Sequence, residues 1–90
     1  MRQTIYKYPI PVEDRVVIEM PEGASVLSVQ MQGLTPCVWV LCNPDAPKRP
    51  RALRIYGTGH TLPEDPGRFI GTFQMHGGAL VFHLFDPSEV

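Results

Sequence analysis

Phe69-Ile-Gly-Thr-Phe-Gln-Met75, His76-Gly-Gly78 and Ala79-Leu-Val-Phe-His-Leu-Phe85 are the consecutive segments that decide the fold. Two runs rich in aromatic and β-branched residues flank a link with adjacent glycines, which is a strong signal for a β-hairpin. Glycine suits such a link because it adopts positive φ without the steric cost of a Cβ atom. The stretch therefore predicts two antiparallel strands, over residues 69–75 and 79–85.

Upstream of this hairpin, five further segments have a strand pattern and are bounded by proline and glycine. They are residues 4–8, 15–20, 25–32, 37–42 and 51–56. Alternation in the third segment predicts that Leu27, Val29 and Met31 share its buried face. The fourth segment, Cys37-Val-Trp-Val-Leu-Cys42, is apolar on both faces, which predicts a central strand with cover on each side.

Helix signals are absent, since no long stretch free of proline and glycine has apolar residues at helical spacing. The chain therefore predicts an all-β fold, a small two-layer β-sandwich or barrel of about seven short antiparallel strands. We expect a single domain over residues 1–90, with 86–90 as a frayed tail. The proline-rich residues 43–50 predict a mobile loop.

The length and charge of the chain limit the partners it can have. Its 90 residues fit one domain with one core, and eight basic against nine acidic side chains give a net charge of −1. This balance argues against a membrane or a nucleic acid as partner unless a local patch binds it. The N-terminus leads directly into a strand pattern and no apolar run could span a bilayer, so we expect an unprocessed intracellular protein.

The two cysteines, Cys37 and Cys42, lie in the same predicted strand, where they would face opposite sides about 16 Å apart. A disulfide needs Cα atoms within about 7 Å of each other, so this strand excludes an intramolecular bridge. We therefore expect two buried thiols that pack as small hydrophobic groups.

Residues that could carry catalysis or bind a metal form no convincing pattern. The three histidines, His60, His76 and His83, lack the short spacing typical of zinc ligands. The segment Gly57-Thr-Gly-His60 lacks the lysine and the helix of a phosphate-binding loop, so a strand-ending turn is the favoured interpretation. We expect no enzyme activity, no metal and no cofactor.

One local cluster of cations is the best candidate for a binding site. Arginine binds phosphates and carboxylates bidentately and tyrosine stacks on bases, so a nucleotide, a nucleic-acid backbone or an acidic protein surface would suit it. An ordinary solvated edge is the alternative interpretation. The candidate binding residues are Lys48, Arg49, Arg51, Arg54, Tyr56, His60 and Arg68.

Several motifs are similar to those of a known group of proteins. They are Tyr6-Lys-Tyr-Pro9, Pro36-Cys-Val-Trp39, Arg54-Ile-Tyr-Gly-Thr-Gly-His60, Gly71-Thr-Phe-Gln74 and Gly77-Gly-Ala-Leu-Val-Phe-His-Leu-Phe85. With these motifs the chain resembles a family of small uncharacterised proteins encoded by bacteriophages and prophages, a domain of unknown function. The resemblance implies a phage product in the bacterial cytoplasm or a minor part of the virion.

Two functions are compatible with these observations. The first is a non-catalytic binding protein that inhibits a bacterial anti-phage defence, by occluding a host protein or by sequestering a small nucleotide. The second is a structural or assembly protein that self-associates into a homo-oligomer. The last predicted strand distinguishes the two functions. Both faces of this strand are apolar, and the interior of one sandwich cannot bury both. Val81 and Phe85 would form an interface if they are exposed, and burial of these residues would remove the main support for self-association.

Overall fold

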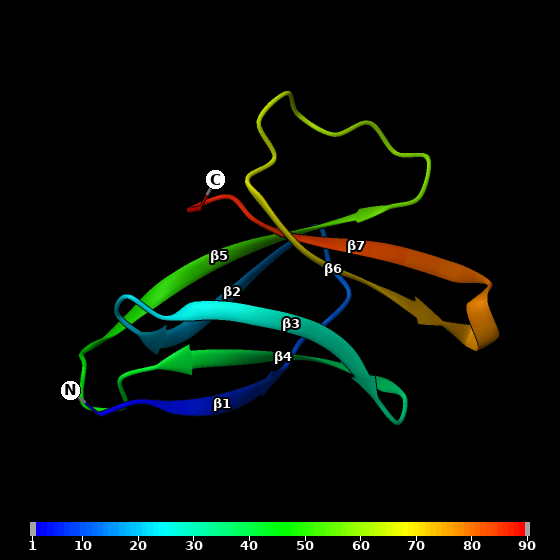
Figure 1. Ribbon diagram of the computed structural model, residues 1–90. Helices are drawn as coiled ribbons and strands as arrows, with labels where there is room; N and C mark the ends of the chain where they lie inside the picture. The colour runs from blue at the N-terminus through cyan, green and yellow to red at the C-terminus, as the bar shows by residue number, and fades with distance from the viewer. Residues whose placement is uncertain (1, 90) are drawn as a thin grey trace.

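The computed structural model describes residues 2–89, and its seven antiparallel strands in two sheets confirm the predicted all-β fold (Figure 1). The small sheet has the order β1-β4-β3, and the large sheet has the order β2-β5-β7-β6. The strands are β1 Thr4–Pro9, β2 Arg15–Pro21, β3 Ser25–Gln32, β4 Thr35–Cys42, β5 Lys48–Gly57, β6 Arg68–Met75 and β7 Leu80–Asp86. No helix within residues 2–89 is long and apolar enough to cross a membrane.

The two sheets pack face to face around one apolar core. The molecule measures 41 × 32 × 15 Å, and its smallest dimension leaves room for two layers only. Strand β3 lies against β6, where a Cβ atom on Gly71 would come within 3.0 Å of Val29 Cγ1. The core residues with no measurable exposure are Val26, Val38, Val40, Leu53 and Leu84.

The predicted hairpin of β6 and β7 is confirmed. A 3₁₀ turn at His76–Gly78 links the strands, and all three of its residues have positive φ, from 53° at His76 to 95° at Gly78. Opposite Phe73 lies Phe82, whose ring packs 5.5 Å away on the inner face. The two glycines take the left-handed conformation at little cost, which allows the chain to reverse here.

The predicted alternation in β3 is wrong at Leu27. A β-bulge between Val26 and Ser28 leaves Leu27 without a partner on β4, and its side chain is 44% exposed. Because the bulge adds one residue, the buried face passes from Val26 to Val29 instead of including Leu27.

Two further predictions about the middle of the chain need correction. Strand β4 is central in its sheet, but Trp39 is only half-buried because, in the described part of the chain, no third layer covers the outer face of the small sheet. Residues 48–50 belong to β5 rather than to a loop, since they pair with the end of β2. The expected state of the cysteines is confirmed, as both thiols are buried and free.

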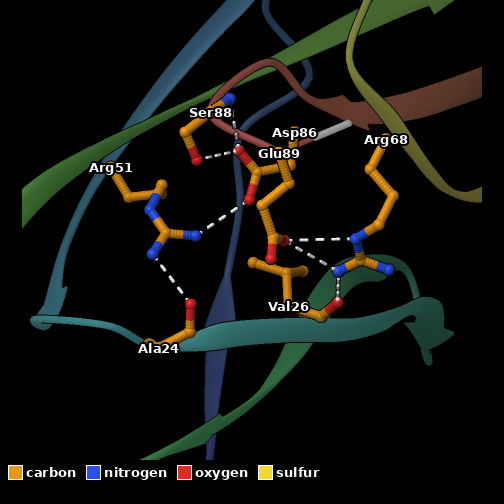
Figure 2. Close-up of polar contacts among 7 residues, drawn as sticks. All are labelled: Ala24, Val26, Arg51, Arg68, Asp86, Ser88 and Glu89. Carbon is orange, nitrogen blue, oxygen red and sulfur yellow. Dashed lines mark hydrogen bonds and ion pairs between the residues drawn. The ribbon is translucent and has the colours of Figure 1, made fainter.

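The C-terminal segment, for which a frayed tail is predicted over residues 86–90, makes several polar contacts within residues 86–89 (Figure 2). Asp86 has no measurable exposure and accepts hydrogen bonds from the backbone N–H and the hydroxyl of Ser88, at 3.0 and 2.6 Å. Glu89 forms an ion pair with Arg68 at 3.1 Å. The last predicted tail residue, Val90, lies outside the described residues.

Candidate functional site

The structure divides the predicted cationic cluster into three parts. Lys48 and Arg49 form the first part, at the start of β5, where they pair with Pro21 and Met20 at the end of β2. Both are exposed, and the Arg49 guanidinium donates to the carbonyl of Lys48 at 3.2 Å. They therefore lie near one end of the sheet, about 26–30 Å from the other end of β5.

Arg51 and Arg68 form the second part and point between the sheets (Figure 2). Arg51 donates to the Asp86 carboxylate and to the carbonyl of Ala24, both at 2.8 Å. Arg68 donates to Glu89 and to the carbonyl of Val26. These two arginines connect the large sheet with the small one, so the structure does not bring them to the surface with the rest of the cluster.

The third part lies on the outer face of the large sheet, where cross-strand pairing builds one continuous row. Arg15 on β2 lies opposite Arg54 on β5, Arg54 lies opposite Phe85 on β7, and Phe85 lies opposite Phe69 on β6. Directly opposed residues point to the same face of a sheet. The row, Arg15, Arg54, Phe85 and Phe69, thus runs from cations at one edge to aromatic rings at the other, and we name it the outer-face row.

Tyr56 extends the aromatic part of this row. Its ring lies 5.7 Å from that of Phe85, edge to face, and Phe85 lies 5.4 Å from Phe69. The guanidinium carbon of Arg54 is 6.0 Å from the centre of the Tyr56 ring. Phe69 is 53% exposed, so the cluster presents an aromatic surface to solvent, with Arg54 at its border.

The cationic end of the row carries two arginines at directly opposed positions of neighbouring strands. Neither Arg15 nor Arg54 forms an ion pair within residues 2–89, where the ion pairs are Arg2–Asp45, Arg51–Asp86 and Arg68–Glu89. Arg54 Nε donates to the backbone carbonyl of Asp14 at 3.2 Å, which leaves its two terminal nitrogens for other acceptors. Like charges directly opposite each other repel, and an anion bound between them would relieve this repulsion.

His83 occupies the next row of the same face, between Tyr56 and Thr72. Its Nε2 lies 2.7 Å from the hydroxyl of Thr58, and its Nδ1 lies 2.9 Å from that of Thr72. Both ring nitrogens are therefore engaged, and the threonines hold the ring in one orientation. This arrangement makes His83 a fixed wall of the site and provides no base with a vacant lone pair.

The connection between β5 and β6, residues 58–67, forms the remaining wall. It rises from the large sheet on the side away from the small sheet (Figure 1). A pocket of about 240 Å³ lies between this connection and the aromatic end of the row. That volume is below the range of about 300–1,000 Å³ for drug-sized ligands and suits a single ring. The lining residues are Gly57, Thr58, Gly59, His60, Leu62, Phe69, His83 and Phe85.

The structure brings together three of the seven predicted binding residues, Arg54, Tyr56 and His60, at this site. Arg15, Phe69 and Phe85 lie beside them, and the sequence pattern did not predict these neighbours. Within residues 2–89, no group of three His, Cys, Asp or Glu side chains could hold a metal ion. The arrangement offers aromatic surface, two guanidinium groups and hydroxyls, which are groups that bind and orient a partner.

Comparison with known proteins identifies the family. The family described as "Domain of unknown function (DUF7352)" matches residues 1–90, and the chain belongs to it. No curated protein and no solved structure matches the chain.

Proposed function

We propose that this member of the DUF7352 family is a non-catalytic binding protein, and that the outer face of its large sheet is the binding surface. The observation that carries the proposal is the outer-face row, with exposed Phe69 at one end and the Arg15–Arg54 pair at the other. Tyrosine and arginine are enriched among the residues that dominate binding energy at interfaces. A partner with an acidic group beside an apolar or aromatic surface would complement both ends.

The groups at the site support binding rather than catalysis. A catalytic site needs a nucleophile or an acid–base group whose reactive atom faces the substrate. Here the two nitrogens of His83 are both taken by threonine hydroxyls, and His60 is exposed on the connection above the sheet. The proposed function therefore places no chemical step at this face.

The role we propose in the cell is occlusion. As a product of a phage or prophage, the protein would cover a functional surface of a bacterial anti-phage effector, or would withhold a small signalling nucleotide from it. Both actions need an exposed, preorganised face and no turnover. The β-sheet scaffold provides such a face, since side chains on strands are positioned more rigidly than side chains on loops.

Native mass spectrometry of the protein purified from a bacterial host tests this proposal. We expect a mass above that of the bare chain for the wild type, and loss of the added mass in Phe69→Ser and Arg54→Glu. Arg49→Glu makes the same charge change on an exposed arginine of β5 outside the site. It is therefore the matched control, and it should retain the added mass. If both outer-face variants retain the wild-type mass, this face is not the binding surface.

A second candidate function, self-association, is favoured by the same exposed face. Phe85 and Val81 lie on the outer side of β7, and within residues 2–89 the connection 58–67, not a third sheet, lies beside them on that side. The connection carries Glu64 and Asp65, both exposed, while the opposite edge of the face carries the Arg15–Arg54 pair. A two-fold axis through the middle of the face would bring the arginines of one copy toward the acidic connection of the other.

A further inference from the structure

We infer that the outer-face site takes a single nucleoside phosphate, with its phosphate at the arginine pair and its base at the aromatic pocket. This inference rests on the proposed function, because it names the class of ligand for the same face. Two features of the outer-face row support it. Arg15 and Arg54 have no acidic partner within residues 2–89, and a pocket of about 240 Å³ lined by aromatic rings lies at the other end of the row.

The phosphate end follows from the geometry of the two arginines. Arg15 and Arg54 are directly opposed on β2 and β5, so their Cα atoms are about 5 Å apart and both side chains rise from the same face. The planar guanidinium fork matches the oxygens of a phosphate, and two forks supply several charge-assisted hydrogen bonds. Arg54 is already oriented by its bond to the Asp14 carbonyl, which lowers the entropy lost on binding.

The base end follows from the pocket. Phe69 and Phe85 line it from the sheet, and His60 and Leu62 line it from the connection. A flat heterocycle between these groups would stack on a ring, an interaction worth about 1–3 kcal/mol per base. The hydroxyl of Thr58, which also lines the pocket, bonds His83 Nε2 and the carbonyl of Val81, so a ligand can use only a remaining lone pair of its oxygen.

The spacing between the two ends suits one nucleotide. Arg54 is one strand away from Phe85 and two strands away from Phe69, which corresponds to about 5–10 Å across the sheet. A sugar can bridge that distance between its base and its phosphate. The ligand thus lies across the strands, along the outer-face row.

The charges around the site argue against a longer nucleic acid. Glu64 and Asp65 are exposed on the connection at the pocket end, and Glu13 and Asp14 precede Arg15 at the other end. Further phosphates would meet acidic side chains at both ends of the row. The net charge of −1 also offers no broad attraction to a polyanion.

Chemical-shift titration of the ¹⁵N-labelled protein tests the inference, with adenosine 5′-monophosphate, adenosine and inorganic phosphate as separate probes. We expect the nucleotide to shift the amides of Gly57, Thr58, His83 and Phe85. Phosphate alone should shift residues near Arg15 and Arg54, and adenosine should bind roughly tenfold more weakly than the nucleotide because it lacks the charged contacts. An oligothymidylate should bind no more tightly than thymidine 5′-monophosphate.

Three variants locate the two ends of the site. Arg54→Gln should weaken binding of adenosine 5′-monophosphate about tenfold and leave adenosine binding unchanged, because it removes one guanidinium from the phosphate end. Phe69→Ser should weaken binding of both probes by about fivefold or more, because it removes a stacking ring. Lys7→Gln removes an exposed cation from the small sheet and should change neither.

Two results would overturn the inference. One is the absence of nucleotide-induced shifts at the outer-face row, and the other is equal weakening of adenosine and its monophosphate by Arg54→Gln. These results would leave the proposed function intact if Phe69→Ser and Arg54→Glu still remove the added mass in native mass spectrometry. Tighter binding of the oligothymidylate would instead identify a nucleic-acid surface and reject the single-nucleotide site.

Discussion

At the scale of single residues, Asp86 has the most demanding environment in the molecule. Its carboxylate has no measurable exposure. It accepts hydrogen bonds from the Arg51 guanidinium and from the backbone N–H and hydroxyl of Ser88. Arg51 reaches it from β5 and also bonds the carbonyl of Ala24, which precedes β3 (Figure 2). The pair therefore connects three segments of the chain that are far apart in sequence.

Replacing Asp86 with alanine should lower the free energy of unfolding by about 3 kcal/mol. The substitution leaves the mostly buried Arg51 guanidinium without its counter-charge, and breaking one side of a buried ion pair costs about 3–5 kcal/mol. Ser88→Ala removes only a hydroxyl donor and should cost about 1 kcal/mol. Urea unfolding of the three proteins measures these differences, and equal stability of the wild type and Asp86→Ala would show that the ion pair contributes nothing.

The position of Arg51 shows what the sequence could predict at this scale. Alternation within 51–56 places Arg51 on the same side as Leu53 and Ile55, which is the core side. The pattern thus contained the signal that Arg51 points inward, although its charge suggested a surface patch. Its partner could not be predicted, because Asp86 is distant in sequence and only the pairing of β5 with β7 brings the two together.

At the scale of elements, the start of β6 is locked by the C-terminal segment that passes over it. Gly67, just before β6, has φ +92°, and a Cβ atom there would lie 2.3 Å from the Asp86 carbonyl oxygen and 2.5 Å from Pro87 Cα. Both contacts are with backbone, which cannot move aside without shifting the end of β7. Only glycine satisfies the conformation and the space together.

Gly67→Ala should therefore cost about 3 kcal/mol of unfolding free energy, from the strained φ and the backbone contact together. Gly59→Ala is the matched control, because Gly59 has nearly the same φ, +89°, and nothing lies within 4 Å of its added Cβ. This control should cost about 1 kcal/mol. Thermal or urea unfolding gives both values. An equal loss of unfolding free energy in the two variants would mean that residues 86 and 87 move aside, and that their close approach to Gly67 does not affect stability.

The sequence predicted the presence of the strands better than their boundaries and bulges. The hairpin of β6 and β7 follows from local signals, which are two apolar runs and a glycine link, so it was found without tertiary information. The bulge at Leu27 and the start of β5 at Lys48 depend on partners in other strands. A bulge changes the face of every later residue in its strand, and no local signal at Leu27 announces it.

At the scale of the whole molecule, two layers leave one face of β7 outside the core. Leu84 lies inside with no measurable exposure, while Phe85 and His83 are half-buried on the outer face. The sequence predicted this conflict, since both faces of the strand are apolar. It could not predict that Arg15 and Phe69 complete the row, because strand order decides which residues lie beside Arg54 and Phe85.

The same row makes a prediction about assembly. If self-association is the function, sedimentation velocity should show a dimer for the wild type at high protein concentration and a monomer for Phe69→Ser. Arg15→Glu with Arg54→Glu should also give a monomer, because each arginine pair would then face the acidic Glu64 and Asp65 of the other copy.

Charge reversal on both sides separates a specific interface from non-specific association. Adding Glu64→Arg and Asp65→Arg to the doubly reversed chain restores opposite charges across the two-fold axis, so the dimer should return. The Glu64→Arg, Asp65→Arg chain alone should be monomeric, since four cations would then meet. A wild type that remains monomeric at every concentration contradicts self-association and leaves the outer-face row available to a different partner.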